Sequence, residues 1–474
     1  MKICNFLILT AFLSLTSIAQ TNQLIDINEL KNEDEFITME DALKRPLAVY
    51  NLNLSFSNLT AIPDGISKLK NLQKLDLSAN RFIELPENCM SPYLQIFTAS
   101  RNAIRSINPN LFLLKNLAVI DLSSNYLSFL PAEIENAKLL SSLNLENNEI
   151  SELPANIGNL YNLQSLFLKK NILVNLPVEF TKLVNLKELD LSYNNLENLP
   201  EEIGRLNNLQ ILNIRNNNFT GSIPASIGSC LALQKLDLTY NSLNSLPASI
   251  GLLKNLESLI LTYNDIAELP QNIGELSNLK ELNCLSNDLK KIPESLSKLA
   301  NLEVLVLAYN SLTEIPTSIT NLSKLYELDL TSNKLSTLPN LNDLQQLAAL
   351  KLSDNKRLNI HTEIAKFEKL TNLKVLELSE NDLLTLPIQI KSLTLRRLNL
   401  SGNPGLNNPE TLEFIGSLSS LEELNLSGCN LIALPDSFLE SLNSLKKLDL
   451  RNNRFSNSRI DKIKTMLPVT QVLF

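Results

Sequence analysis

The chain lacks the residue groupings that catalysis and metal binding require. Its 474 residues include one histidine, His361, and neither a cysteine nor a pair of carboxylates with catalytic spacing stands near it. One histidine cannot build the usual zinc sites, and no glycine-rich loop that could hold a phosphate is present. The sequence therefore predicts a protein that is not an enzyme and that uses no metal and no small-molecule cofactor.

A repeated pattern organises the chain and must position any residues that bind a partner. Leu186 opens one copy of L-x-x-L-x-L-x-x-N-x-L, and Leu209 opens the next copy 23 residues later. About 18 copies follow one another, and two of them, at 347–372 and 395–420, are enlarged to 26 residues. Self-similarity of this kind predicts a solenoid, which grows by adding units rather than separate cores.

Physical chemistry explains why leucine and asparagine occupy their positions in the repeat. The last two leucines of L-x-x-L-x-L alternate, so in a strand both point to one face and the residue between them points to the other. Successive strands are then predicted to form a parallel sheet. The asparagine, such as Asn194, falls where the chain turns inward, and its amide can satisfy backbone groups of adjacent turns. We therefore interpret the asparagines as structural.

The second half of each unit returns the chain along the outer side. In Leu199-Pro-Glu-Glu-Ile203-Gly-Arg-Leu206, the proline is predicted to open a helical or 3₁₀ turn, with Ile203 and Leu206 facing inward. The run L-x-x-L-P-x-x-I-G-x-L-x-N-L resembles the leucine-rich repeats of the Ras-group and Scribble-like type, and similar repeats in exported bacterial proteins. The resemblance spans roughly residues 47–455 and implies an α/β solenoid: a horseshoe with a parallel β-sheet on its concave face and short helices or 3₁₀ turns on its convex face. One unit, which contains Phe219-Thr-Gly-Ser-Ile223-Pro224, resembles the plant receptor variant.

The solvent-facing strand positions form the predicted concave surface. Between the two inward leucines this column is mostly polar, but it changes to Ile260 and Val306, which we expect to come from neighbouring strands, with a lone Phe167 earlier. Exposed aromatic and apolar side chains favour an interface. Alternatively, tyrosine before the asparagine is a common variant whose ring shields the next strand. The predicted partner-binding patch consists of Tyr193, Tyr240, Ile260, Tyr263, Leu285, Val304, Val306 and Tyr309.

The four cysteines that follow the export segment are predicted to be isolated residues of the core or the convex side. Cys284 takes an inward leucine position and Cys429 an asparagine position, whereas Cys89 and Cys230 lie on returning segments of different units. Their predicted separation exceeds the roughly 7 Å that a disulfide tolerates.

Both ends carry distinctive segments. Lys2, an apolar run and Ser17-Ile18-Ala19 are typical of an export signal, and the alternative is a membrane anchor, for which the run is short. Thr38 begins a capping-box pattern. The predicted boundaries are a signal peptide at 1–19, a loose acidic polar tail at 20–37, an N-terminal capping helix at 38–46, the solenoid at 47–459 and a C-terminal cap at 460–474.

Charge narrows the class of partner. The formal net charge of −8, without a basic block, disfavours nucleic acid and anionic membrane surfaces. With no second apolar segment, we expect no membrane insertion. The sequence favours an exported, non-catalytic recognition module, secreted or periplasmic, that binds a protein or peptide through its concave face. The alternative is a structural or adhesive envelope protein held through its ends or convex face.

Overall fold

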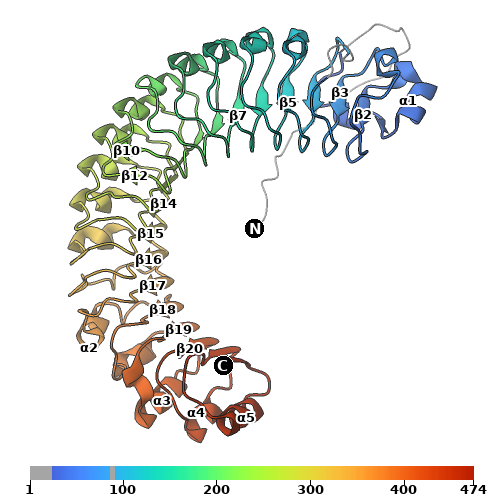
Figure 1. Ribbon diagram of the computed structural model, residues 1–474. Coiled ribbons are helices and arrows are strands. Elements are labelled where there is room, and N and C mark those ends of the chain that lie inside the picture. Colours follow the sequence, from blue (N-terminus) through green and yellow to red (C-terminus); the bar gives the residue numbers. More distant parts are fainter. Residues whose placement is uncertain (1–23, 86–90) are drawn as a thin grey trace, which may run out of the picture.

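The computed structural model describes residues 24–85 and 91–474. The predicted signal segment at 1–19 lies outside these residues, as does Cys89. The repeats stack into a curved solenoid with the strands along its inner side and the helical turns along its outer side (Figure 1). The predicted horseshoe with a concave parallel sheet is therefore confirmed.

One parallel sheet runs through the whole arc. Each strand pairs in register with the strand of the next repeat, so equivalent repeat positions form columns across the sheet; for example, Leu236 pairs with Leu259, and Leu259 with Leu282. Within the described residues the sheet has 20 strands. They are β1 (Glu35–Phe36), β2 (Asn51–Asn53), β3 (Lys74–Asp76), β4 (Ile96–Thr98), β5 (Val119–Asp121), β6 (Ser142–Asn144), β7 (Ser165–Phe167), β8 (Glu188–Asp190), β9 (Ile211–Asn213), β11 (Lys235–Asp237), β13 (Ser258–Ile260), β14 (Glu281–Asn283), β15 (Val304–Val306), β16 (Glu327–Asp329), β17 (Ala349–Lys351), β18 (Val375–Glu377), β19 (Arg397–Asn399), β20 (Glu423–Asn425), β21 (Lys447–Asp449) and β22 (Gln471–Leu473).

Short helical turns form the outer layer. In the regular repeats a proline such as Pro247 precedes a single 3₁₀ turn, and Ile250 and Leu253 from that turn point into the core. The 3₁₀ turns are η1 (Leu30–Asn32), η2 (Pro46–Ala48), η3 (Ile66–Lys68), η4 (Pro109–Leu113), η5 (Ala132–Asn136), η6 (Ala155–Asn159), η7 (Val178–Lys182), η8 (Ile203–Arg205), η9 (Ala225–Ser229), η10 (Ala248–Leu252), η11 (Gln271–Glu275), η12 (Glu294–Lys298), η13 (Thr317–Asn321), η14 (Ile364–Lys366), η15 (Ile388–Ser392) and η16 (Pro404–Asn407). The α-helices are α1 (Met39–Lys44), α2 (Ile360–Glu363), α3 (Pro409–Gly416), α4 (Asp436–Ser441) and α5 (Asn457–Met466).

Glycine in the outer turns has a packing reason. A Cβ atom placed on Gly251 in η10 would lie 2.4 Å from the carbonyl oxygen of Asn272 in η11, and one on Gly274 would lie 2.0 Å from that of Ser295. No real Cβ tolerates such distances. The Ile-Gly pair of the repeat therefore allows neighbouring outer turns to approach each other closely.

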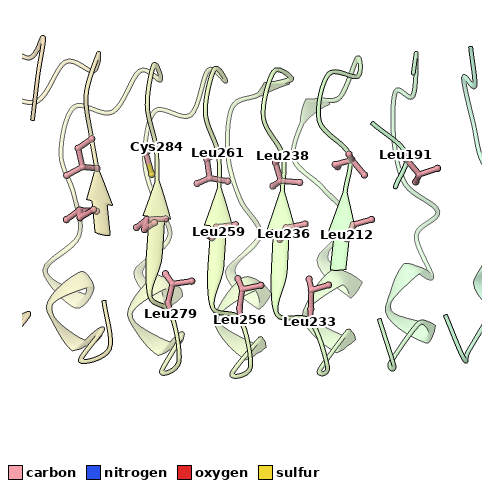
Figure 2. Close-up of a cluster of buried hydrophobic side chains, with 14 of the residues drawn as sticks. Leu191, Leu212, Leu233, Leu236, Leu238, Leu256, Leu259, Leu261, Leu279 and Cys284 are labelled. Atoms are coloured by element: carbon pink, nitrogen blue, oxygen red, sulfur yellow. The ribbon is translucent and has the colours of Figure 1, made fainter. Parts of the chain in front are cut away.

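The core is a stack of leucine layers between the sheet and the outer turns. Figure 2 shows Leu212, Leu236 and Leu259 in one column, and Cys284 in the column of Leu238 and Leu261. The thiols of Cys230, Cys284 and Cys429 are free and buried. Burial raises the pKa of the Cys230 and Cys284 thiols to about 12, as expected for unreactive core residues.

An asparagine ladder closes the bend after each strand. The Asn194 side chain is buried; its Nδ2 donates to the carbonyls of Leu168 and Leu191, both at 2.9 Å, and its Oδ1 accepts from the Leu173 N–H at 3.0 Å. The prediction that these asparagine amides satisfy backbone groups of adjacent turns is thus confirmed.

A second ladder, which the sequence pattern alone did not reveal, precedes the strands. Asn185 donates to the carbonyl of Tyr161 at 2.7 Å, Asn208 to that of Val184 at 2.8 Å. This is the asparagine of the L-x-N-L run, and it joins each repeat to the previous one at the opposite bend.

Several repeats depart from the regular form. After the Phe219 insertion, β10 (Thr220–Gly221) pairs with β12 (Ser242–Leu243) in a separate two-stranded parallel sheet. The extra residues of the units at 347–372 and 395–420 form α2 and α3 rather than loops. His361 lies on α2, where its Nε2 is 2.9 Å from Thr385 Oγ1.

The prediction of a loose tail at 20–37 is wrong for its described part. Leu30 is fully buried, β1 pairs in parallel with β2, and the Ile25 N–H donates to the Gln73 side chain at 3.0 Å. The acidic residues Glu33 and Asp34 suggested a solvated segment, but the apolar residues around them cover the open end of the sheet.

The helix α1 lies within the cap predicted at 38–46, whereas α5 begins three residues before the cap predicted at 460–474. Thr38 is the N-cap of α1, accepting from the Asp41 N–H at 3.2 Å, and Ala42 of that helix is buried. At the other end α5 begins at Asn457, and β22 extends the sheet beyond β21.

Candidate functional site

The eight predicted binding residues lie on the concave side at two levels. Ile260 on β13 and both Val304 and Val306 on β15 form part of the strand floor, where they are half-buried while Leu259 and Leu305 between the layers are fully buried. The alternation predicted for these strands is therefore present. The others lie in the bends that follow the strands: Tyr193, Tyr240, Tyr263, Leu285 and Tyr309.

The polar column of the floor has a structural role that the sequence pattern alone did not reveal. Asp190 Oδ1 accepts from the Ser192 N–H at 2.8 Å, and Asp237 Oδ1 accepts from the Thr239 N–H at 2.9 Å. Asn213 makes the same bond. This is an Asx turn, in which a short polar side chain satisfies a backbone donor two residues later.

The apolar members of the column forgo this bond. Phe167, Ile260 and Val306 carry no acceptor, so each repeat gives up a hydrogen bond worth about 0.5–1.5 kcal/mol. All three side chains are half-buried on the floor rather than fully buried in the core. Turn formation therefore does not explain why these three positions are apolar.

The apolar surface is less continuous than predicted. Ile260 and Val306 are not on neighbouring strands, because β14 runs between them and places Asn283 in the column. Val304 has Glu327 beside it on β16. The floor thus alternates apolar and polar side chains, because adjacent repeats vary independently at positions that face solvent.

Tyr240 and Tyr263 form the most compact aromatic feature of the patch. Their rings stack with centroids 4.3 Å apart and an interplanar angle of 9°, and the side chains remain 43% and 42% exposed. Both residues have left-handed backbone, with φ of +52° and +54°, as does the residue at this position in the other repeats. The rings shield each other, as the alternative interpretation expects, and still leave a large aromatic surface open.

Two cations lie beside these tyrosines in the bends that follow the strands, which form the rim of the concave face. The sequence analysis did not single them out. The guanidinium carbon of Arg215 lies 5.4 Å from the Tyr240 ring centroid, and Lys169 Nζ lies 5.9 Å from that of Tyr193. Both distances fall within cation–π range. Each cation stands two residues before a ladder asparagine. This shared repeat position points to a common rim only when the repeats are aligned with one another.

The floor beside this rim is acidic. Desolvation raises the pKa of Glu146 and of Glu188, and the nearby Asp190 carboxylate raises both further. A ligand on this part of the concave face therefore meets cations, rings and the Glu146 carboxylate at the rim, and carboxylates such as that of Glu188 on the strands.

A hollow on the concave face lies nearer the C-terminal end. It encloses about 240 Å³ and is lined by β18 to β21. Its charges largely neutralise one another: Arg397 pairs with Glu423 at 3.1 Å, and Arg451, beside the hollow, pairs with Asp449 at 2.6 Å. Glu377 and Lys447 also line the hollow and form no salt bridge among the described residues, so one free charge of each sign remains there.

Among residues 24–85 and 91–474, no group of three histidine, cysteine or acidic side chains is arranged to hold a metal ion. In the same part of the chain, no helix has both the length and the apolar character needed to cross a membrane.

Family models agree with the repeat geometry, and the chain belongs to the leucine-rich repeat family. The matches to the two leucine-rich-repeat models together cover more than half of the chain. The first model matches 92–150, 138–196, 161–219, 207–266, 277–335 and 300–358, and the second matches 420–442 and 444–466. Proteins of this family commonly act as protein-interaction modules.

Solved structures with the same architecture include a leucine-rich-repeat protein of Leptospira interrogans. It is 34% identical, with a TM-score of 0.70, over 93% of this chain and all of that one. The plant peptide hormone receptor RGFR1, solved in complex with RGF2, is 25% identical with a TM-score of 0.61, over 93% of this chain and 80% of that one. A volume-regulated anion channel subunit of Rattus norvegicus, LRRC8D, is 31% identical over 108 residues, which are 22% of this chain but only 13% of the subunit.

Proposed function

We propose that this protein is an exported, non-catalytic recognition module that binds a protein or peptide through its concave face. The observation that carries the proposal is the loss of the Asx turn at Phe167, Ile260 and Val306. At these positions the repeat gives up a local hydrogen bond and presents an apolar side chain to the inside of the arc. Apolar and aromatic anchors of this kind dominate binding energies.

Further support comes from the rim and from relatives. The stacked Tyr240 and Tyr263 offer a rigid aromatic surface next to Ile260. The receptor RGFR1, which shares this architecture, is a peptide hormone receptor. We place the present chain with the LPxxI repeats of exported bacterial proteins, with cleavage after the segment at 1–19 and a secreted or periplasmic location.

A peptide library tests the proposal. The immobilised protein is used to enrich peptides from a random phage-displayed library, and the dissociation constant of an enriched peptide is measured for each variant. Ile260→Asp combined with Tyr263→Ala removes two anchors, and an aspartate at 260 can form the Asx turn of Asp237. We expect a nearly unchanged melting temperature and a loss of about 2 kcal/mol, some thirtyfold in affinity.

Asp76→Asn and Asp121→Asn are the matched controls. They lie in the same column outside the patch and keep the turn acceptor. We expect less than about 0.5 kcal/mol from either. Unchanged affinity in the double variant would contradict the concave site, and failure to enrich any peptide would favour a structural or adhesive role instead.

A further inference from the structure

Arg215 is a half-buried cation that has no anionic partner among the described residues. Its Nε is buried and has no hydrogen-bond partner, and among the described residues it forms no salt bridge. The contact with the Tyr240 ring compensates only part of the desolvation of a guanidinium. Arginine normally satisfies such a position with a carboxylate, which it binds through two parallel hydrogen bonds.

Another repeat of the same chain shows what is missing. Arg451 occupies the repeat position of Arg215, two residues before the ladder asparagine. Its guanidinium donates two hydrogen bonds to the Asp449 carboxylate, from Nε at 3.0 Å and from Nη2 at 2.6 Å. The residue that corresponds to Asp449 is Asn213. The solenoid thus completes the pair within one repeat and leaves it incomplete in the other.

Asn213 cannot take the place of that carboxylate. Its Oδ1 accepts from the Arg215 backbone N–H at 3.1 Å, and its Nδ2 donates to Asp190 Oδ2 at 3.2 Å. Asn213 is neutral, and both ends of its amide are engaged. Asp190 and Asp237 flank Asn213 in the column, but Asp190 accepts from Asn213, Asp237 accepts from the Thr239 N–H, and neither forms a salt bridge with Arg215 among the described residues.

The rim repeats this arrangement two units earlier. Lys169 packs against the Tyr193 ring, and the residue two before it is Phe167, again without a carboxylate. Two strand spacings separate the two cations, roughly 9.6 Å. A peptide in the extended polyproline II form rises about 3.1 Å per residue with three residues per turn, so its positions i and i+3 lie on the same side roughly 9.3 Å apart. The rim therefore matches an extended segment with two acidic groups at i and i+3.

We propose that Arg215, packed between its own repeat and the stacked Tyr240 and Tyr263, binds a carboxylate of an extended peptide segment, with Lys169 as the second cation of the same rim. The proposal rests on the proposed function and specifies the chemistry of the partner. The rings keep water from one side of the ion pair and so strengthen it. The carboxylate belongs either to an aspartate or glutamate side chain or to the C-terminus of the partner.

Defined peptides separate these sources. Nonapeptide pools with randomised flanks carry Glu-x-x-Glu or Gln-x-x-Gln at the centre, each with a free or an amidated C-terminus, and retention on the wild-type protein is measured. We expect the glutamate pools to be retained at least about tenfold better than the glutamine pools. Dependence on the free C-terminus instead would identify the chain end as the source, provided that Arg215→Gln removes that dependence.

Three variants decide whether Arg215 is responsible. Arg215→Gln removes the cation, whereas Asn213→Asp supplies the carboxylate that Asp449 gives to Arg451 and keeps the Asx turn. Both should abolish the preference for carboxylates. Asn213→Asp also loses the bond to Asp190 and sets two carboxylates side by side, so we expect a slightly lower melting temperature with the fold retained. The control is Arg451→Gln, at the same repeat position, which should keep the preference.

Several results would overturn the inference. Equal retention of acid and amide pools by the wild-type protein, or a preference that survives both Arg215→Gln and Asn213→Asp, excludes carboxylate binding at Arg215. If peptides enriched by the wild-type protein still lose affinity in the variant with Ile260→Asp and Tyr263→Ala, concave recognition stands and only the carboxylate fails. If neither set of variants changes binding, both proposals fail.

Discussion

Removal of one ladder asparagine should destabilise the solenoid far more than an exposed substitution does. Asn194 is 5% exposed and makes two donor bonds of 2.9 Å to the carbonyls of Leu168 and Leu191. In Asn194→Ala these bonds are lost, at about 1 kcal/mol each. The N–H of the fully buried Leu173 also loses its acceptor, which costs about 1–3 kcal/mol. The expected total is about 3–5 kcal/mol.

Urea unfolding monitored by far-ultraviolet circular dichroism measures this loss, and hydrogen exchange of the Leu173 amide locates it. The exposed neighbour supplies the control, because Asn195→Ala should change the free energy of unfolding by about 0.5 kcal/mol or less. A loss below about 1 kcal/mol for Asn194→Ala, with the Leu173 amide still protected, would refute the reasoning that these bonds hold adjacent repeats together.

Two further substitutions test the floor and the outer layer. Asp237→Ala leaves the N–H of the buried Thr239 without its acceptor and should cost about 1–3 kcal/mol in urea unfolding, whereas Asp237→Asn keeps the turn and should be nearly silent; equal effects of the two would exclude the Asx turn as the cause. Gly251→Ala places a Cβ 2.4 Å from the Asn272 carbonyl oxygen and should also cost about 1–3 kcal/mol, against the usual gain from alanine in a helical turn; a more stable variant would show that the outer turns separate easily.

The repeat itself was predictable because every unit carries the same pattern of buried and exposed positions. Alternation of leucines assigned the strand face, and the strand register places Ile260 and Val306 in the predicted column. The Asx turns could also have been predicted, since aspartate and asparagine recur in one column two residues before a buried N–H.

Other features depend on what a single segment cannot reveal. The tail was judged by its acidic residues, whereas Leu30 finds a hydrophobic surface only because the sheet ends there. The role proposed for Arg215 emerges only when its partner Asn213 is compared with Asp449 in a distant repeat. The break at Asn283 likewise needs the order of strands, because each exposed position varies independently of its neighbours.

The small second sheet gives the horseshoe an uneven elasticity. A solenoid in which each unit contacts only its neighbours bends like a spring, and the bending accumulates over its joints. The joint between the units of Arg215 and Tyr240 is fastened by β9 with β11 and again by β10 with β12, where the Asn244 N–H bonds the Gly221 carbonyl at 2.9 Å. We therefore expect this joint to bend less than the others. The guanidinium of Arg215 and the Tyr240 ring, 5.4 Å apart on its two sides, should then keep their relative position when the arc bends.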